Sequence, residues 1–354
     1  MTAVTIIDEA PTTVDAVVDD EGVTFHLGSS QLEAALGWTL TTRGLCRGDA
    51  CVPLSRAAAA GRGADHGDQI DLTEVATALR RLLVVDPEAG IAALARPSEA
   101  RRRVLRDLVA PDLELPGLDG RTHRLDEWHG HKRLLVAFAS WCGCRYDLPG
   151  WQALHDELRP SGFTAVAVAL DDDPDAVRPF AEGLTMPVLY DPGRALPELF
   201  AISNVPTVVW IDGDGRIVRP AGAAHGTDLF ADFTGIEAGP HLEAVRRWVI
   251  EGRAPMTAED AAAVVADLSE DEVRARLHFR IAAFARGRGD EVTTRRHVDL
   301  AAELAPDDLA VWRAAMPLVG EDPFGDDFLE RYEAWRARGS PAHGLPPMVS
   351  PAGS

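Results

Sequence analysis

The sequence predicts an α/β protein whose central part, residues 110–225, alternates short apolar strands with helices. The strand candidates are 134–139, 164–170 and 205–211. Segments with helical character lie between or beside them, at 149–158, 176–182 and 195–200. Alternation of this kind is typical of a layered fold with an at least partly parallel sheet. The run Asp-Gly-Asp-Gly at 212–215 predicts a hairpin that closes the domain.

Two smaller regions are expected to flank this core. Residues 1–13 are interpreted as a disordered tail, and 14–109 as a small α/β module with a Cys-x-x-x-x-Cys pattern. Residues 226–338 are predicted to be helical, with a capping-box pattern at 269–272 before two amphipathic segments. These segments resemble one tetratricopeptide-type hairpin. The Pro- and Gly-rich residues 339–354 are expected to be a second disordered tail.

Composition narrows the classes of function. A chain of 354 residues is too long for one ordinary core, and its net charge of −21 argues against nucleic acid and anionic membrane surfaces as partners. There is no cationic start followed by an apolar run, and no apolar stretch of roughly 18 residues that could span a membrane. We therefore expect a cytoplasmic protein. Its four cysteines are then expected to be catalytic, redox-sensing or metal-binding.

Two of the cysteines follow a predicted buried strand directly. Cys142 and Cys144 are separated by one glycine, at a turn that leads into a predicted helix. Backbone N–H groups and the helix dipole at such a turn favour a thiolate over a thiol. The spacing therefore indicates redox chemistry.

Three segments resemble the thioredoxin-like reductases of the TlpA/ResA and redoxin group, and they follow one another along the chain as they do in that group. Residues 110–120 are similar to the group's entry strand and turn, and 204–212 to its cis-proline loop and following strand. Residues 139–149, Ala-Ser-Trp-Cys-Gly-Cys-Arg-Tyr-Asp-Leu-Pro, are similar to the active-site pattern Trp-Cys-x-x-Cys-Arg-x-Glu-x-Pro, with one residue fewer between the cysteines. The resemblance implies a thioredoxin-like fold and thiol–disulfide oxidoreductase activity.

The whole chain, with Cys46, Cys51 and the helical region, is similar to a bacterial subgroup of ResA-like proteins with a WAxxUGC motif. Some members carry selenocysteine at the position of Cys142. This resemblance implies that Cys142 is the reactive chalcogen. It also implies a cis Pro206 facing the active-site sulfur, with Val205 offering backbone hydrogen bonds to an extended substrate.

The mixed disulfide or sulfenic acid formed on Cys142 would be resolved by a second thiol, and two routes remain open. Cys144 is the neighbouring candidate, although closure with Cys142 requires a non-helical first turn, which Gly143 permits. The pair Cys46 and Cys51 could instead form a disulfide that exchanges with Cys142. Alternatively, all four thiolates could hold zinc or copper, or Cys46 and Cys51 could be unpaired or structural.

Trp141, Gly143 and Arg145, beside Cys142, are predicted to bind substrate together with Val205 and Pro206. Trp141 is expected either to shield the thiolate and shape the substrate-binding surface or to be a plain core residue. Arg145 is expected to add positive charge beside the sulfur, and Asp147 to interact with the helix dipole.

The predicted function is a thiol–disulfide oxidoreductase that needs no dissociable cofactor, because the electrons reside on sulfur. Its substrate would be a protein or small-molecule disulfide, or a peroxide, with a reducing or oxidising partner of unspecified identity. A thiol peroxidase is one alternative, although the motif Pro-x-x-x-Thr-x-x-Cys is not reproduced around Cys142. A metal-binding or metal-delivery protein and a non-catalytic thioredoxin-like interaction module are the others.

Overall fold

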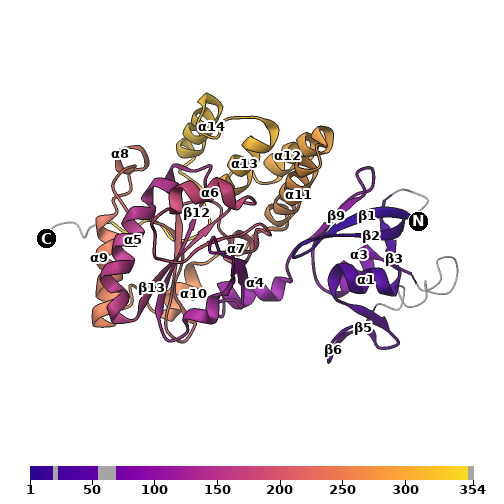
Figure 1. The fold of residues 1–354 in the computed structure, drawn as a ribbon, viewed down its shortest axis with the longest axis horizontal. Helices are drawn as coiled ribbons and strands as arrows, with labels where there is room; N and C mark the ends of the chain where they lie inside the picture. Colours follow the sequence, from indigo (N-terminus) through magenta and orange to yellow (C-terminus); the bar gives the residue numbers. More distant parts are fainter. Residues whose placement is uncertain (19–22, 55–68, 350–354) are drawn as a thin grey trace. The chain divides into compact units, whose positions relative to one another are not determined.

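The computed structural model describes residues 1–18, 23–54 and 69–349, and the chain divides into two compact units (Figure 1). Unit 1 comprises Met1–Ser98, Ser269–Pro306 and Pro317–Gly320. Unit 2 comprises Glu99–Leu268, Asp307–Met316 and Glu321–Ser354. No helix in the described part of the chain has the length and apolar character needed to cross a membrane.

Unit 1 is built on a six-stranded sheet with the order β7-β3-β2-β1-β9-β8. The strands are β1 (Thr2–Ile7), β2 (Pro11–Val18), β3 (Phe25–Leu27), β7 (Ile70–Asp71), β8 (Leu83–Asp86) and β9 (Ile91–Leu94). Only β1 and β9 pair in parallel; the other neighbours are antiparallel. Helices α1 (Ser29–Leu36) and α3 (Leu72–Ala78) contribute buried leucines to the same core.

The expectation of a disordered tail at residues 1–13 is wrong. Residues 2–7 form β1, whose Val4 and Ile6 are buried, and β2 begins at Pro11. The parallel partner of β1 lies more than 80 residues further along the chain. Local pattern therefore did not reveal this strand.

The helical region predicted for 226–338 is divided between the two units. In unit 1, α11 (Glu270–Gly287) and α12 (Glu291–Leu304) form the predicted hairpin, and the capping box of Ser269 and Glu272 is present. Helix α11 packs on β8 and β9. Ion pairs from Arg296 on α12 to Asp86 and Glu88 attach the hairpin to the N-terminal sheet.

A pair of histidines, the buried His297 and the half-buried His278, lies where this hairpin meets the sheet. Nδ1 of His278 and Nδ1 of His297 are 2.8 Å apart, and Nε2 of His297 is 2.8 Å from Oδ2 of Asp86. The Asp86 carboxylate accepts a hydrogen bond from Nε2–H of His297. Nδ1 of His297 is therefore the acceptor in the bond between the two rings, and Nδ1–H of His278 is the donor. Burial and the neighbouring histidine lower the pKa of His278 to about 4.

This pair predicts a pH dependence for the stability of unit 1. The folded pKa of His278 lies below the unfolded value of 6.5, so its contribution is complete above pH 6.5. The contribution is lost as pH falls from 6.5 towards 4, because protonation then favours the unfolded chain. We expect urea midpoints to fall over this range, and to fall less in His278→Gln, whose amide can still donate to His297. Equal slopes for the two proteins would contradict this account.

Unit 2 contains a five-stranded sheet with the order β14-β13-β12-β15-β16. Its strands are β12 (Lys132–Phe138), β13 (Phe163–Ala169), β14 (Val188–Tyr190), β15 (Thr207–Ile211) and β16 (Ile217–Ala223). The first three are parallel to one another, while β15 and β16 are antiparallel to their neighbours. The predicted strands and closing hairpin are confirmed, and the sheet has the thioredoxin-like arrangement that the resemblance implied.

Helices surround this sheet. They are α4 (Ser98–Leu105), α5 (Leu148–Leu158), α6 (Pro174–Ala181), α7 (Ala195–Leu199), α8 (Ala231–Thr234), α9 (Gly239–Glu251), α10 (Ala258–Val264), α13 (Leu309–Ala315) and α14 (Asp326–Ala337). Helices α5 and α9 lie side by side (Figure 1), and Arg246 pairs with Glu157 between them.

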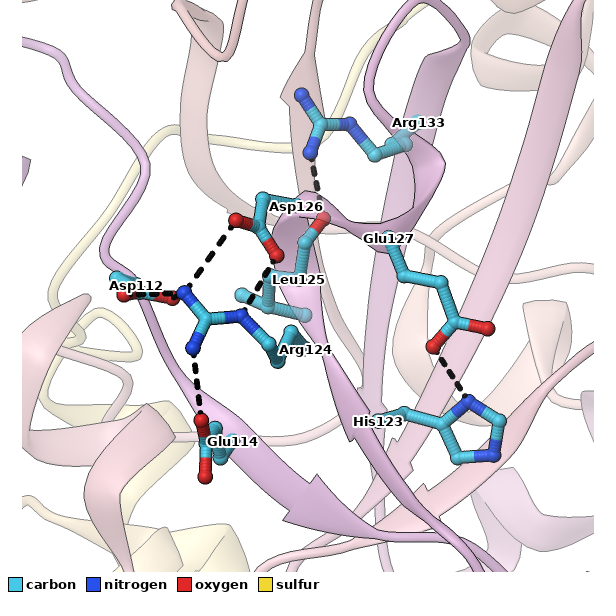
Figure 2. A network of polar contacts seen from close by, with 8 residues as sticks. All are labelled: Asp112, Glu114, His123, Arg124, Leu125, Asp126, Glu127 and Arg133. Carbon is cyan, nitrogen blue, oxygen red and sulfur yellow. Dashed lines mark hydrogen bonds and ion pairs between the residues drawn. The ribbon is translucent and has the colours of Figure 1, made fainter.

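A short hairpin of β10 (Glu114–Pro116) and β11 (Thr122–Arg124) leads into the sheet. Figure 2 shows Arg124 pairing with Asp112, Glu114 and Asp126 around this hairpin. Buried Arg133 on β12 donates to the carbonyl oxygen of Leu125, which connects the entry segment to the central strand. These contacts fix the beginning of β12, the strand that precedes the cysteines.

The second predicted tail, 339–354, is partly wrong. Within it, N–H of His343 donates to Oγ of Ser203, and N–H of Leu345 donates to the carbonyl oxygen of Ala221. Residues 350–354 lie outside the described part. Residues 343–345 therefore run beside β16 and Ser203 in unit 2, a placement that bears on the site described next.

Candidate active site

Cys142 caps a helical turn at the end of β12. It is the N-cap of the 3₁₀ helix η3 (Gly143–Asp147), and its Sγ accepts a hydrogen bond from N–H of Cys144 at 3.3 Å. The carbonyl oxygen of Val205 lies 3.5 Å from the same sulfur, and the Val205–Pro206 peptide bond is cis. The structure thus brings the motif cysteines together with Val205 and Pro206.

The two thiols are free, buried and electrostatically unequal. Burial raises the pKa of Cys142, but the Cys144 thiol, the charge of Arg313, N–H of Cys144 and the charge of His225 outweigh it and lower the pKa to about 7. Burial and the neighbouring Cys142 raise the pKa of Cys144 well above its usual range. At pH 7 about half of the molecules therefore hold a Cys142 thiolate beside a Cys144 thiol.

This difference predicts the pH profile of alkylation. Labelling of Cys142 by iodoacetamide should rise through a midpoint of about 7, because only the thiolate attacks. At pH 7 about half of Cys142 would be ionised, against about one per cent for a thiol of pKa 9.0. Cys144→Ala should raise the midpoint by removing the S–H donor. Mass spectrometry of each cysteine measures this, and a wild-type midpoint near 9 would contradict it.

Three polar residues near the sulfur escaped sequence reasoning or had another predicted role. Arg313 on α13 and His225 after β16 supply the charges named above, from positions far along the chain. Asp147 is the N-cap residue of α5, but its side chain makes no capping hydrogen bond. The carboxylate is fully buried and accepts hydrogen bonds from Nδ1 of His225 at 2.7 Å and from Oγ1 of Thr227. It therefore holds the 225–227 loop beside the cysteines.

A close backbone approach keeps this loop against α5. A β-carbon on Gly150 would lie 2.1 Å from the carbonyl oxygen of Gly226, so only glycine fits without a backbone shift. Gly150→Ala should lower the free energy of unfolding by about 1–3 kcal/mol, as overpacking does. Gly239→Ala is the matched control, since nothing lies within 4 Å of a β-carbon there. Equal urea midpoints for the two variants would refute the close contact.

The other predicted substrate-binding residues differ in their surroundings. Gly143 lines the cavity described below, and a β-carbon there would lie 2.8 Å from the Phe230 ring. Trp141 is buried and donates from Nε1 to the carbonyl oxygen of Leu170, which fits the core alternative. Arg145 stacks on Phe180 and Phe324, with its guanidinium carbon 4.8 and 4.5 Å from the ring centres. Neither Trp141 nor Arg145 lines the cavity.

Cys46 and Cys51 form a disulfide in unit 1. They are directly opposed on β5 (Gly44–Arg47) and β6 (Ala50–Val52), which with β4 (Thr39–Thr41) form a three-stranded sheet. Cys46 is buried, and its sulfur lies 3.2 Å from Oγ1 of Thr41. Among the described residues, no three His, Cys, Asp or Glu side chains gather in a metal-binding arrangement.

A cavity of about 840 Å³ in unit 2 contains the cysteines in its wall. Its volume is within the range of small-molecule sites. Aromatic side chains of α14, among them Phe328, Tyr332 and Trp335, line it together with residues of the cysteine and cis-proline loops. Phe233 stacks on Tyr332, with ring centres 4.9 Å apart. The site therefore combines a reactive thiolate with an apolar enclosure.

The site combines a thioredoxin-like sheet, a thiolate at a helix N-terminus and a neighbouring cis proline. This combination places it in the class of thioredoxin-like redox domains. Residues 108–219, about a third of the chain, match the model of the AhpC/TSA family, and this segment is similar to the thioredoxin-like TlpA/ResA and redoxin group. Membership of the WAxxUGC subgroup stays a prediction.

The chain is similar to curated proteins named thiol-disulfide oxidoreductase ResA. The protein from Geobacillus thermodenitrificans is 31% identical over 114 residues, covering 31% of this chain and 66% of the relative. The protein from Oceanobacillus iheyensis is 32% identical over 116 residues, covering 31% and 60%. The matches thus span less than two thirds of these relatives.

A solved structure is also similar in sequence. The exposed lipoprotein thioredoxin of Streptococcus pneumoniae is 30% identical, with a TM-score of 0.28, covering 30% of this chain and 85% of that one.

Proposed function

We propose that this protein is a thiol–disulfide oxidoreductase in which Cys142 is the nucleophile. The observation that carries the proposal is the free Cys142 sulfur at a helix N-terminus, with its pKa lowered to about 7, beside Cys144 and cis Pro206. The names of the ResA relatives support the same activity. The substrate class is a disulfide of a protein or of a small molecule.

In the first step, the Cys142 thiolate attacks one sulfur of the substrate disulfide. The substrate S–S bond breaks, a Cys142–substrate disulfide forms, and the departing thiolate carries away the electron pair. In the second step, another protein thiolate attacks Cys142, releasing the second substrate thiolate. The substrate gains two electrons and the protein acquires a disulfide, which an external dithiol must reduce before the next cycle.

The charge of Cys142 prepares Cys144 for the second step. Besides burial, the hydrogen bond and negative charge of Cys142 raise the pKa of Cys144. Both effects disappear when Cys142 becomes part of a mixed disulfide, so the pKa of Cys144 falls and its thiolate becomes available. The pair Cys46 and Cys51 is the second route for resolution. It can supply the attacking thiolate only after an external dithiol has reduced the disulfide that it forms.

A redox titration of the full chain tests this proposal. Free thiols are alkylated at controlled potentials, and each modified cysteine is located by mass spectrometry. Joint titration of Cys142 with Cys144 supports a self-contained centre, while joint titration with Cys46 or Cys51 supports a relay. If Cys142 keeps one state across the biological range, the oxidoreductase proposal fails.

The alternatives predict other results. A thiol peroxidase would consume peroxide with formation of a Cys142 sulfenic acid. A four-thiolate metal site would require the Cys46–Cys51 disulfide to open first. An interaction module would keep its function in Cys142→Ser. The cytoplasmic location expected from the sequence stays a prediction.

A further inference from the structure

The cavity beside Cys142 is enclosed by residues outside the matched family segment. A second part of its wall comes from α13, α14 and residues 339–347, all beyond residue 219, where the family match stops. N–H of Ala310 donates to the carbonyl oxygen of Ser203, and Nη2 of Arg219 donates to that of Pro346. These bonds attach both ends of the wall to the core. Cys142 is only 4% exposed beneath it.

The backbone beside Cys142 is poorly suited to an extended peptide. The family resemblance implied that Val205 would hydrogen-bond such a substrate. Here the N–H of Val205 already donates to Oδ1 of Asn204 at 2.8 Å, and its carbonyl oxygen lies 3.5 Å from the Cys142 sulfur. A peptide would have to displace the first contact and also pass the α14 wall to reach the sulfur.

The charge of the cavity contrasts with that of the chain. The chain has 56 acidic residues and a net charge of −21, yet no Asp or Glu of the described residues lines this cavity. Two arginines, Arg313 and Arg336, do line it. An anion would therefore enter a site free of carboxylates and rich in cations.

Arg313 has a donor available for such an anion. Its side chain is buried, with 8% exposure, and its Nε and Nη2 donate to the carbonyl oxygen of Pro323 at 3.1 and 2.9 Å. Among the described residues, Nη1 has no hydrogen-bond acceptor. The guanidinium also lies 3.6 Å from the centre of the Phe328 ring, which places a cation against an aromatic surface.

From these observations we infer that the cavity takes a small disulfide with an aromatic or apolar body and a carboxylate, which pairs with Arg313. The inference rests on the proposed exchange activity of Cys142 and names its substrate class. The thiolate attacks the S–S bond while the carboxylate stays with the guanidinium. One substrate half then remains on Cys142 and the other departs as a thiolate.

Two aromatic disulfides test the role of charge on the reduced full chain. They are 5,5′-dithiobis(2-nitrobenzoate), which carries carboxylates, and the neutral 2,2′-dithiodipyridine; mass spectrometry locates the adduct on Cys142. The rate with the carboxylated disulfide divided by the rate with the neutral one does not depend on the thiolate fraction, since the same sulfur attacks both. We expect Arg313→Gln to lower this ratio about tenfold and Arg313→Lys to retain most of it. Arg331→Gln removes a charge from α14 outside the cavity lining and should leave the ratio unchanged.

A protection experiment on the unmodified protein covers the case in which Arg313→Gln does not fold. Benzoate should slow alkylation of Cys142 at concentrations at which benzamide does not. Oxidised insulin should react with Cys142 at least about a hundredfold more slowly than the carboxylated disulfide. Equal protection by benzoate and benzamide, an unchanged ratio in folded Arg313→Gln, or equally fast reaction with insulin would overturn the inference. Failure of both small disulfides to modify wild-type Cys142 would instead reject the proposed function.

Discussion

Replacing Cys144 by serine is expected to stop the cycle after its first step and leave the substrate attached to Cys142. The attacking thiolate remains, because Arg313, His225 and the backbone N–H of residue 144 still lower the pKa of Cys142. The resolving thiol is gone, so release must await a thiol from solution. We expect release to slow by at least about a hundredfold, given the advantage of a neighbouring group over one in solution. Intact-mass measurements after a single addition of a small disulfide would show the adduct.

Matched variants decide between the two routes of resolution. Cys142→Ser should form no adduct at all. If Cys51→Ser accumulates the adduct and Cys144→Ser turns over normally, the Cys46–Cys51 pair resolves the intermediate and the role given to Cys144 is wrong. Accumulation in Cys144→Ser alone assigns resolution to the short motif.

The parts of the site that could be predicted are those encoded by neighbouring residues. Cys142 and Cys144 share a strand-to-helix turn, and Pro206 belongs to a motif read from nine consecutive residues. Steric and dipole effects at such turns depend on local sequence, so the positions of these residues at their turns could be predicted from the resemblance. The cis peptide bond at Pro206 is confirmed in the same way.

The parts that could not be predicted depend on contacts distant in sequence. Arg313 lies 171 positions after Cys142 (313 minus 142), in a short helix whose residues are all buried. His225 has no motif around it, and its proximity to the cysteines depends on its bond to Asp147. The Val205 N–H was predicted to be available, but the preceding side chain occupies it. In each case the outcome is decided by a tertiary contact.

Asp147→Ala is expected to be the most destabilising change around the site. The carboxylate is fully buried and accepts hydrogen bonds from His225 and Thr227. Its removal leaves the ring N–H of buried His225 and the Thr227 hydroxyl without this partner, and opens a small void. A loss of about 3–5 kcal/mol in the free energy of unfolding follows from the cost of breaking a buried polar network. Urea denaturation measures it.

Thr227→Val separates the two bonds. It removes only the hydroxyl and should cost about 1–2 kcal/mol, since Asp147 then keeps His225. The pH midpoint of Cys142 alkylation provides an independent measurement, because a change in stability alone does not shift it. In Asp147→Ala that has remained folded, a displaced His225 no longer lowers the pKa of Cys142, so the midpoint should rise above 7. An unchanged midpoint together with a large loss of stability would limit Asp147 to supporting the fold.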